Sequence, residues 1–410
     1  MAKYEIKDGV GIIPDGETII ANMAFSSCEE LTKVIIPSSV TTIGREAFKG
    51  CKNLESIEIP SSVTSIYAEA FKWCSALKSI TIHKNISMIG LQAFDGCGAL
   101  TSIVVEEENF MYDSRNNCNA IINSATNTLL RGCCNTTIPE GTEVINSYAF
   151  SGCKGLTSIV IPEGVKKIEK WAFFCCHDLT SVVIPKSVTE ISKYGVFSHC
   201  ESLTSIVVEE GNSIYDSREN CNAIIKNGNT LVAGCSTSVI PEGVQTLGYG
   251  AFSGCENLTH IVIPESVTTI GDYAFSDCTA LTDVVIPDSV EYIEQGAFEN
   301  SGLTNIVVPE TVKNLHGVFM KCEKLKTATV KGKLDDYRAD CTFPFMNCPA
   351  LETLTFLDCV RYIKEESCNG CKSLKNIYVP AKKGDYYKKR FAEELHPIIV
   401  ELPPVKKAKK

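Results

Sequence analysis

Cysteine and histidine residues stand together at two places in the sequence, and these residue types bind transition metals. The two clusters are Cys175-Cys176-His177 and His199-Cys200. A structural zinc site needs a tetrahedral set of ligands, usually supplied by closely spaced cysteine pairs. Cys176 and Cys200 instead belong to a column of cysteines that recurs along the chain, so their sulfur atoms are expected to point into the core. We therefore predict no metal site and no cofactor.

The segment Asp-Ser-Arg…Cys-Asn, which occurs twice, contains residue types that nucleophilic catalysis uses. It begins at Asp113 and again at Asp216. A catalytic cysteine needs a base within hydrogen-bonding reach, and neither segment contains a histidine. A local role accounts for the same residues, because Asp and Ser cap turns, Arg pairs with a neighbouring carboxylate, and Asn adopts unusual backbone angles. With no glycine-rich phosphate loop either, we predict that the chain is not an enzyme.

A unit of about 23 residues, repeated almost to the end of the chain, must position these segments. Leu258–Ala280 is one copy, in which Ile261 and Ile263 show the period of a β-strand and Pro264 ends it. The leucine that opens each copy stands at positions 31, 54, 77, 100, 156, 179, 203, 258, 281, 303, 325, 351 and 374. One copy cannot bury its apolar side chains alone, so this periodicity predicts a repeat solenoid in which each copy forms one rung.

Two long intervals between these leucines contain inserts that are copies of each other. Tyr112-Asp113-Ser114-Arg115 in the first matches Tyr215-Asp216-Ser217-Arg218 in the second. Each insert has two short apolar runs separated by turn residues, which predicts a hairpin. The predicted organisation is a capping rung at 1–30, a solenoid at 31–380 with inserts at 106–137 and 209–239, a helix–strand cap at 381–402, and a basic, disordered tail at 403–410.

The cysteines are expected to be core residues and not a disulfide framework. Twelve of the 21 occupy one column of the repeat, at positions 28, 51, 74, 97, 153, 176, 200, 255, 278, 322, 348 and 371. A free cysteine is a small hydrophobe that is readily buried. Parallel Cβ vectors in a stack give poor geometry for a disulfide, and an odd number of cysteines fits a reducing compartment.

Composition and the N-terminal sequence limit the location and the partners. The net charge of −10 and the pI near 5.3 argue against a nucleic-acid partner. No apolar run approaches the length of a transmembrane segment, and residues 1–20 lack the apolar core of a secretory signal. We therefore expect a cytoplasmic protein; the alternative is a cell-surface protein whose export signal is missing from this chain.

The repeat pattern L-x-x-I-x-I-P-x-x-V-x-x-I-x-x-x-A-F-x-x-C resembles the leucine-rich repeats of the Bacteroides-surface-antigen (BspA-like) type. Leu54–Ala76, Leu156–Asp178 and Leu258–Ala280 carry it most plainly, and YDSRNNCNAII and YDSRENCNAII resemble a decorated rung of that family. The resemblance implies a right-handed superhelix with a concave parallel β-sheet and short second strands or 3-10 turns on the other sides. It also implies a function in binding, as a surface adhesin or a protein-interaction module.

One residue of each predicted strand should face outward on the concave side, between two inward residues. These residues are Val104, Val160, Val183, Val207, Val262, Val285 and Val307, and the neighbouring polar column includes His260, Asp283 and Asn305. Valine suits any pleated surface, but a continuous apolar ribbon with a polar rim is typical of an interaction site. We expect a protein or peptide of unknown identity to bind there; the alternative is an adhesin or a structural array that presents a long surface.

Overall fold

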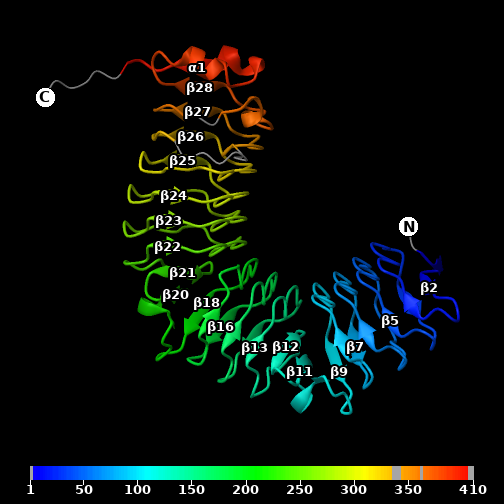
Figure 1. The fold of residues 1–410 in the computed structure, drawn as a ribbon. Helices are drawn as coiled ribbons and strands as arrows, with labels where there is room; N and C mark the ends of the chain where they lie inside the picture. Colours follow the sequence, from blue (N-terminus) through cyan, green and yellow to red (C-terminus); the bar gives the residue numbers. More distant parts are fainter. Residues whose placement is uncertain (1–2, 335–342, 361–362, 405–410) are drawn as a thin grey trace. The chain divides into compact units, whose positions relative to one another are not determined.

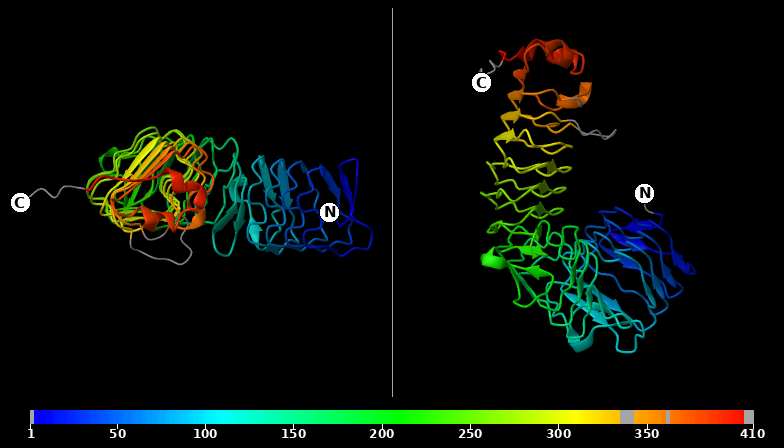
Figure 2. Two further views of the ribbon diagram at one scale, coloured as in Figure 1. Left: turned by 90° about the horizontal axis from the view of Figure 1, so that it is seen from above. Right: turned by 60° about the vertical axis from the view of Figure 1, so that its left-hand side comes forward.

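The computed structural model describes residues 3–334, 343–360 and 363–404, drawn as a ribbon in Figure 1. Most of the predicted tail, residues 405–410, lies outside the described residues. The chain forms two compact units, Met1–Leu203 with Val208–Ser213 and Thr204–Val207 with Ile214–Lys410. Both units are solenoids of short parallel strands, which confirms the predicted fold class. Seen from above, the successive rungs of the second unit nearly superimpose (Figure 2).

Each rung has three sides, and the regular strands occur on two of them. In the first unit, the first side carries β2 (Val10–Ile12), β4 (Lys33–Ile35), β7 (Ser79–Ile82), β9 (Ser102–Val105), β14 (Ser158–Val160) and β16 (Ser181–Ile184). The second side carries β3 (Ile19–Ile20), β5 (Thr42–Ile43), β6 (Ser65–Ile66), β8 (Met88–Ile89), β13 (Val144–Ile145), β15 (Lys167–Ile168) and β17 (Glu190–Ile191). A further strand, β1 (Glu5–Lys7), pairs antiparallel with β2 through the two-residue turn Asp8-Gly9.

The second unit repeats the arrangement. Its first side carries β25 (Asn305–Val308), β26 (Thr327–Val330), β27 (Thr353–Phe356), β28 (Asn376–Val379) and β29 (Ile399–Glu401), and its second side carries β22 (Thr246–Leu247), β23 (Thr269–Ile270) and β24 (Tyr292–Ile293). The strand β18 (Ser205–Val208) contains the point where the chain passes between the units. The strand predicted in Leu258–Ala280 is wrong for that copy, because residues 258–264 form no regular strand although Ile261 and Ile263 are buried.

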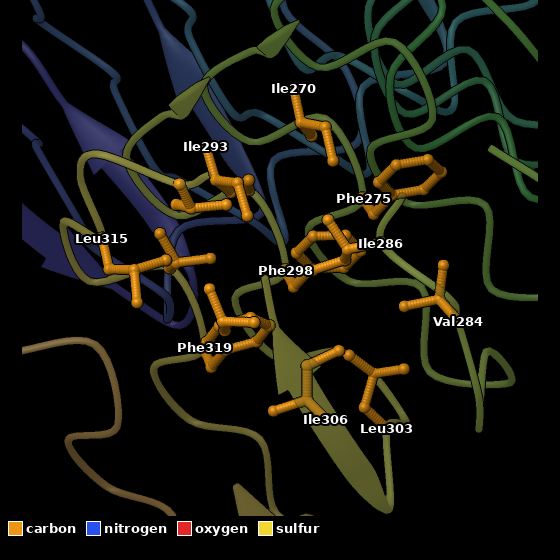
Figure 3. Packing of buried hydrophobic residues seen from close by; sticks show 14 of the residues in the cluster. Ile270, Phe275, Val284, Ile286, Ile293, Phe298, Leu303, Ile306, Leu315 and Phe319 are labelled. Atoms are coloured by element: carbon orange, nitrogen blue, oxygen red, sulfur yellow. The ribbon is translucent and has the colours of Figure 1, made fainter. Parts of the chain in front are cut away.

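Stacked phenylalanines form the third side of the core. Within the first unit, Phe150 stacks on Phe173 with ring centroids 5.1 Å apart and an interplanar angle of 4°. In the second unit, Phe275 stacks on Phe298 at 5.1 Å, and the row continues through Phe319 (Figure 3). These separations are close to the spacing of neighbouring strands. The phenylalanine rings, one in each rung, therefore stack in the interior with nearly the same spacing as the strands.

The column cysteines line the same interior, and a hydrogen bond explains why a thiol suits the position. The thiol of Cys51 donates to the carbonyl of Phe25 at 3.0 Å, and that of Cys176 donates to Phe150 at 3.1 Å. Burial raises the pKa of Cys51 to about 12. All twenty described cysteines are free. The column thiols Cys51 and Cys176 are therefore both buried and hydrogen-bonded within the fold.

The C-terminal segment, predicted as a helix–strand cap at 381–402, contains two short helices before the strand β29. They are α1 (Gly384–Lys388) and the 3-10 helix η4 (Glu393–Ile398). After α1, Phe391 is buried and its ring lies near that of Tyr387. A shorter 3-10 helix, η3, spans Glu365–Cys368. Among the described residues, no helix has the length and apolar character needed to cross a membrane.

Candidate functional site

The first insert folds into a hairpin that is built into the second side of the solenoid. Its strands are β10 (Tyr112–Asp113), β11 (Ile121–Asn123) and β12 (Thr128–Arg131), and η1 (Arg115–Asn117) follows β10. Both pairs, β10–β11 and β11–β12, are antiparallel, whereas β12 pairs parallel with β13. The second insert repeats the order with β19 (Tyr215–Asp216), η2 (Arg218–Asn220), β20 (Ile224–Lys226) and β21 (Thr230–Ala233).

An ion pair fixes the turn between β10 and β11. Arg115 donates from Nε to Asp113 Oδ1 at 2.8 Å and from Nη2 to Oδ2 at 2.7 Å. Ser124 also donates to Asp113, and the third guanidinium nitrogen of Arg115, Nη1, donates to Asn127 Oδ1. Partial burial acts to raise the pKa of Asp113, but the hydrogen bonds from Arg115 and Ser124 outweigh it and leave that pKa lowered. Asp113 and Arg115 therefore bind each other within the insert, which agrees with the local structural role predicted for them.

Three asparagines between β10 and β11 of this insert adopt left-handed backbone angles. The φ angles are 57° for Asn116, 53° for Asn117 and 60° for Asn119. Asparagine tolerates this region better than most residues because its short polar side chain forms local hydrogen bonds. The conformation turns the chain back toward β9, so that η1 lies across from that strand.

The insert leaves one edge of β9 without a strand partner. On its other edge β9 pairs parallel with β7, and the N–H of Glu106 donates to Ile82 at 2.9 Å. Residues alternate between the two edges of a parallel ladder, so the backbone groups of Ile103 and Val105 point toward the insert. Asn119 Oδ1 accepts the N–H of Ile103 at 2.8 Å. Among the described residues, no strand pairs with this edge.

A cleft of about 560 Å³ follows this edge. Its volume lies in the range typical of ligand sites. One wall is β9 with the two glutamates that follow it, and the other is the η1 turn. The lining residues are Ile103, Val104, Val105, Glu106, Glu107, Asp113, Ser114, Arg115, Asn116, Asn117 and Asn119.

An exposed aromatic side chain belongs to the same insert. Phe110 is 91% exposed and lies three residues from both Glu107 and Asp113, which line the cleft. The loop that carries it is held by Asn109, which donates to the carbonyl of Ile86 and accepts from the N–H of Tyr112. Sequence reasoning missed Phe110, and the only signal for it was a large aromatic residue in an otherwise polar stretch.

The predicted outward valines are all exposed, and they are divided between the two units. Val104 is 48% exposed and lies in the cleft, whereas Val160 pairs with Val183 in a different sheet. Val207, Val262, Val285 and Val307 belong to the second unit and are exposed, as are His260, Asp283 and Asn305. Beyond Val307 the same column continues as Thr329, Thr355 and Tyr378. The apolar character therefore ends within that unit.

The cysteine–histidine clusters do not converge on a shared centre. Cys200 donates to the carbonyl of Phe173 at 3.1 Å in the core, whereas His177 pairs with Glu201 at the surface. No group of three or more potential metal-ligating side chains occurs in the part of the chain that the structure describes.

Replacing Asp113 by asparagine is expected to loosen the first insert while the solenoid stays folded. Loss of charge-assisted hydrogen bonds worth about 1.5 kcal/mol corresponds to roughly tenfold faster amide exchange in residues 112–131. Because the pKa of Asp113 is lowered in the folded state, its contribution is present at neutral pH and is lost as the pH falls through that pKa. The difference between parent and variant should therefore begin to shrink below about pH 4 and vanish only below the lowered pKa of Asp113. Hydrogen-exchange mass spectrometry measures both effects.

The second insert supplies the matched control. Asp216 accepts from Arg218 in the same geometry, at 2.8 and 2.6 Å. Asp216→Asn should loosen residues 215–233 and leave the first insert unchanged. Equal exchange in Asp113→Asn and the parent at neutral pH would show that the ion pair does not hold the turn.

Comparison with known proteins identifies the repeat. A model of the BspA-type leucine-rich repeat region, with six repeat copies, matches residues 11–122, 129–227, 232–343 and 316–398. The crystal structure of a leucine-rich cell-surface protein from Faecalibacterium prausnitzii is 25% identical, covers 93% of this chain and 90% of that one, and has a TM-score of 0.56. A leucine-rich repeat protein from Eubacterium ventriosum is 26% identical over 72% of this chain and 83% of that one, with a TM-score of 0.51. No curated protein matches the sequence.

These findings overturn one expectation and establish the family. The prediction of a cytoplasmic protein is wrong, because the repeat family and the cell-surface protein from Faecalibacterium prausnitzii point to the cell surface. That prediction took the free thiols as a sign of a reducing compartment, whereas burial and hydrogen bonds to backbone carbonyls account for them. The repeat model covers most of the sequence. The chain therefore belongs to the BspA-type leucine-rich repeat proteins.

Proposed function

We propose that this protein is a non-catalytic cell-surface protein that binds an extended segment of a partner protein in the cleft beside β9. The surface location is supported by the similarity to a leucine-rich cell-surface protein. The observation that carries the binding site is the edge of β9, without a strand partner among the described residues, that lines a cleft of about 560 Å³. An extended peptide adds to such an edge as a further strand, through main-chain hydrogen bonds.

The lining of the cleft defines the kind of segment that fits. The backbone of Val105 offers hydrogen-bonding groups to an added strand, and Val104 offers apolar contact beside it. Glu106 and Glu107 are exposed at one end, so a basic side chain of the partner would be favoured there. Phe110 is exposed and lies in the sequence between Glu107 and Asp113, which line the cleft, and exposed aromatic residues contribute strongly to binding.

A matched pair of substitutions tests the cleft. Val104 and Val160 both face outward, but only Val104 lines the cleft. Linear peptides selected on the parent protein from a random phage-displayed library should bind Val104→Arg at least about tenfold more weakly, since a loss of 1.4 kcal/mol is tenfold in affinity. Binding to Val160→Arg should be unchanged. Bound peptide should also slow amide exchange at Val105.

The same measurement can contradict the proposal. If Val160→Arg abolishes binding and Val104→Arg does not, the outward face of the β14–β16 sheet is the site and the cleft is not. Phe110→Ala provides an independent check, because it removes the neighbouring aromatic contact without changing the strand edge.

The outward face of the second unit is a second candidate for partner binding. Val285 is 76% exposed, and Val262 and Val307 occupy the same position of the flanking rungs. This row is one part of the predicted apolar ribbon, and it suits an adhesive surface. Val262→Lys combined with Val285→Lys should abolish binding if this face is used, with no change in thermal stability because neither side chain enters the core.

A further inference from the structure

The rung that contains Cys371, the last residue of the cysteine column, has a second cysteine. Cys368 stands at the position where the preceding rungs have the stacked phenylalanine. Twelve rungs place phenylalanine in the stack, from Phe25 to Phe345, and the thirteenth places Cys368 there. Three residues later, Cys371 occupies the column and donates to the carbonyl of Phe345 at 3.1 Å. The space left by the missing ring is closed by Phe343, which packs edge-on against Phe345 and Phe391.

The two cysteines are the first and fourth residues of a tight turn. Asn369 has φ −55° and ψ 130°, and Gly370 has φ 80°. The N–H of Cys371 donates to the carbonyl of Cys368 at 3.0 Å. These are the features of a type II β-turn, whose end Cα atoms are less than about 7 Å apart. That separation falls in the range that a disulfide spans.

The pair is also more accessible than the rest of the cysteine column. Cys368 is buried, but Cys371 is half-buried and follows the exposed Asn369. A hydrogen bond from the Cys368 thiol lowers the pKa of Cys371, whereas the same interaction together with burial raises the pKa of Cys368. Cys371 is thus the more nucleophilic and more exposed thiol, and Cys368 lies behind it.

We propose that Cys368 and Cys371 form a reversible dithiol–disulfide site that reacts with small-molecule disulfides. The Cys371 thiolate attacks one sulfur of the small disulfide, which forms a mixed disulfide and releases one small thiol. The Cys368 sulfur then attacks the Cys371 sulfur, which closes the protein disulfide and releases the second small thiol. The two protein thiols are oxidised, the small disulfide is reduced, and the two protons end on the released thiols.

Oxidised glutathione is the probe that tests this site in the full chain. The reduced, folded protein is incubated with it, the remaining thiols are alkylated after denaturation, and the peptides are mapped by mass spectrometry. We expect one disulfide, joining Cys368 to Cys371, and alkylation of the rest of the 21 cysteines. Reduction should restore both thiols. A disulfide that joins either residue to another cysteine, or no disulfide at all, would overturn the proposal.

Two serine variants separate the roles of the two thiols. Cys368→Ser should stop at a stable glutathione adduct on Cys371, because the second attack cannot occur. Cys371→Ser should form neither adduct nor disulfide at Cys368. Cys322→Ser, in the buried column, is the matched control and should react like the parent. Unchanged circular dichroism shows that each variant is folded, and an adduct on Cys368 in place of Cys371 contradicts the assignment.

Discussion

Replacing Phe173 by alanine is expected to destabilise the first unit by about 3–5 kcal/mol. The ring is fully buried and lies between Phe150 and Phe197, with centroids 5.1 and 5.2 Å away. The substitution leaves a cavity and also removes contacts from both neighbouring rungs. In a solenoid each rung is stabilised by its neighbours, so the loss extends beyond one rung. Chemical denaturation followed by circular dichroism measures the change.

Val160→Ala is the control for this prediction. Val160 belongs to the same unit but is 79% exposed, so its truncation should change the free energy of unfolding by less than about 0.5 kcal/mol. Equal stability of Phe173→Ala and Val160→Ala would show that the phenylalanine stack does not hold the unit together.

The core could be predicted from the sequence because the period alone determines which residues face inward. Leucine, phenylalanine and cysteine recur at fixed positions, and the structure buries nearly all of them. The extent of regular strand could not be predicted in the same way. Residues 258–264 keep the alternation of buried and exposed side chains without forming a regular strand. The sequence pattern determines which side chains are buried, whereas a regular strand also requires backbone hydrogen bonds to the neighbouring rungs.

The cleft was only partly predictable. Alternation along the strand identified Val104 as an outward residue, but the opposite wall comes from η1, which lies ten or more residues later and turns back through Asn116 and Asn117. The sequence indicated that the chain turns at these asparagines, but it did not indicate that the turn brings the chain back toward β9. The hydrogen bond from Ile103 to Asn119 likewise depends on where the insert meets the strand.

The two inserts differ at a buried position that their sequence similarity conceals. Arg131 ends β12, and Ala233 stands at the corresponding position of β21. Arg131 is 3% exposed and donates to the carbonyls of Cys97 and Ser151 at 3.1 and 3.0 Å. Asp95, which is also buried, lines the same cavity of about 60 Å³. Each insert together with the rungs before it forms one copy of a duplicated cassette, and in the second copy Ser198 stands at the position of Asp95. Both charged residues of the first cassette are thus replaced in the second.

Arg131→Ala is therefore expected to destabilise the first unit by about 3–5 kcal/mol, since it leaves buried carbonyls unpaired and removes one of the two cations near the buried Asp95, whose ion pair with Lys72 remains. Adding Asp95→Ser recreates the pair found in the second cassette and should recover roughly 1–2 kcal/mol, the coupling expected of interacting neighbours. Arg131→Lys keeps the charge but loses the planar fork, so its cost should be intermediate. A double variant whose loss equals the sum of the two single losses would show that Arg131 and Asp95 act independently. Recovery of stability in the double variant would show instead that Arg131 and Asp95 interact across the cavity. That interaction would explain why the second cassette lacks both residues and still folds.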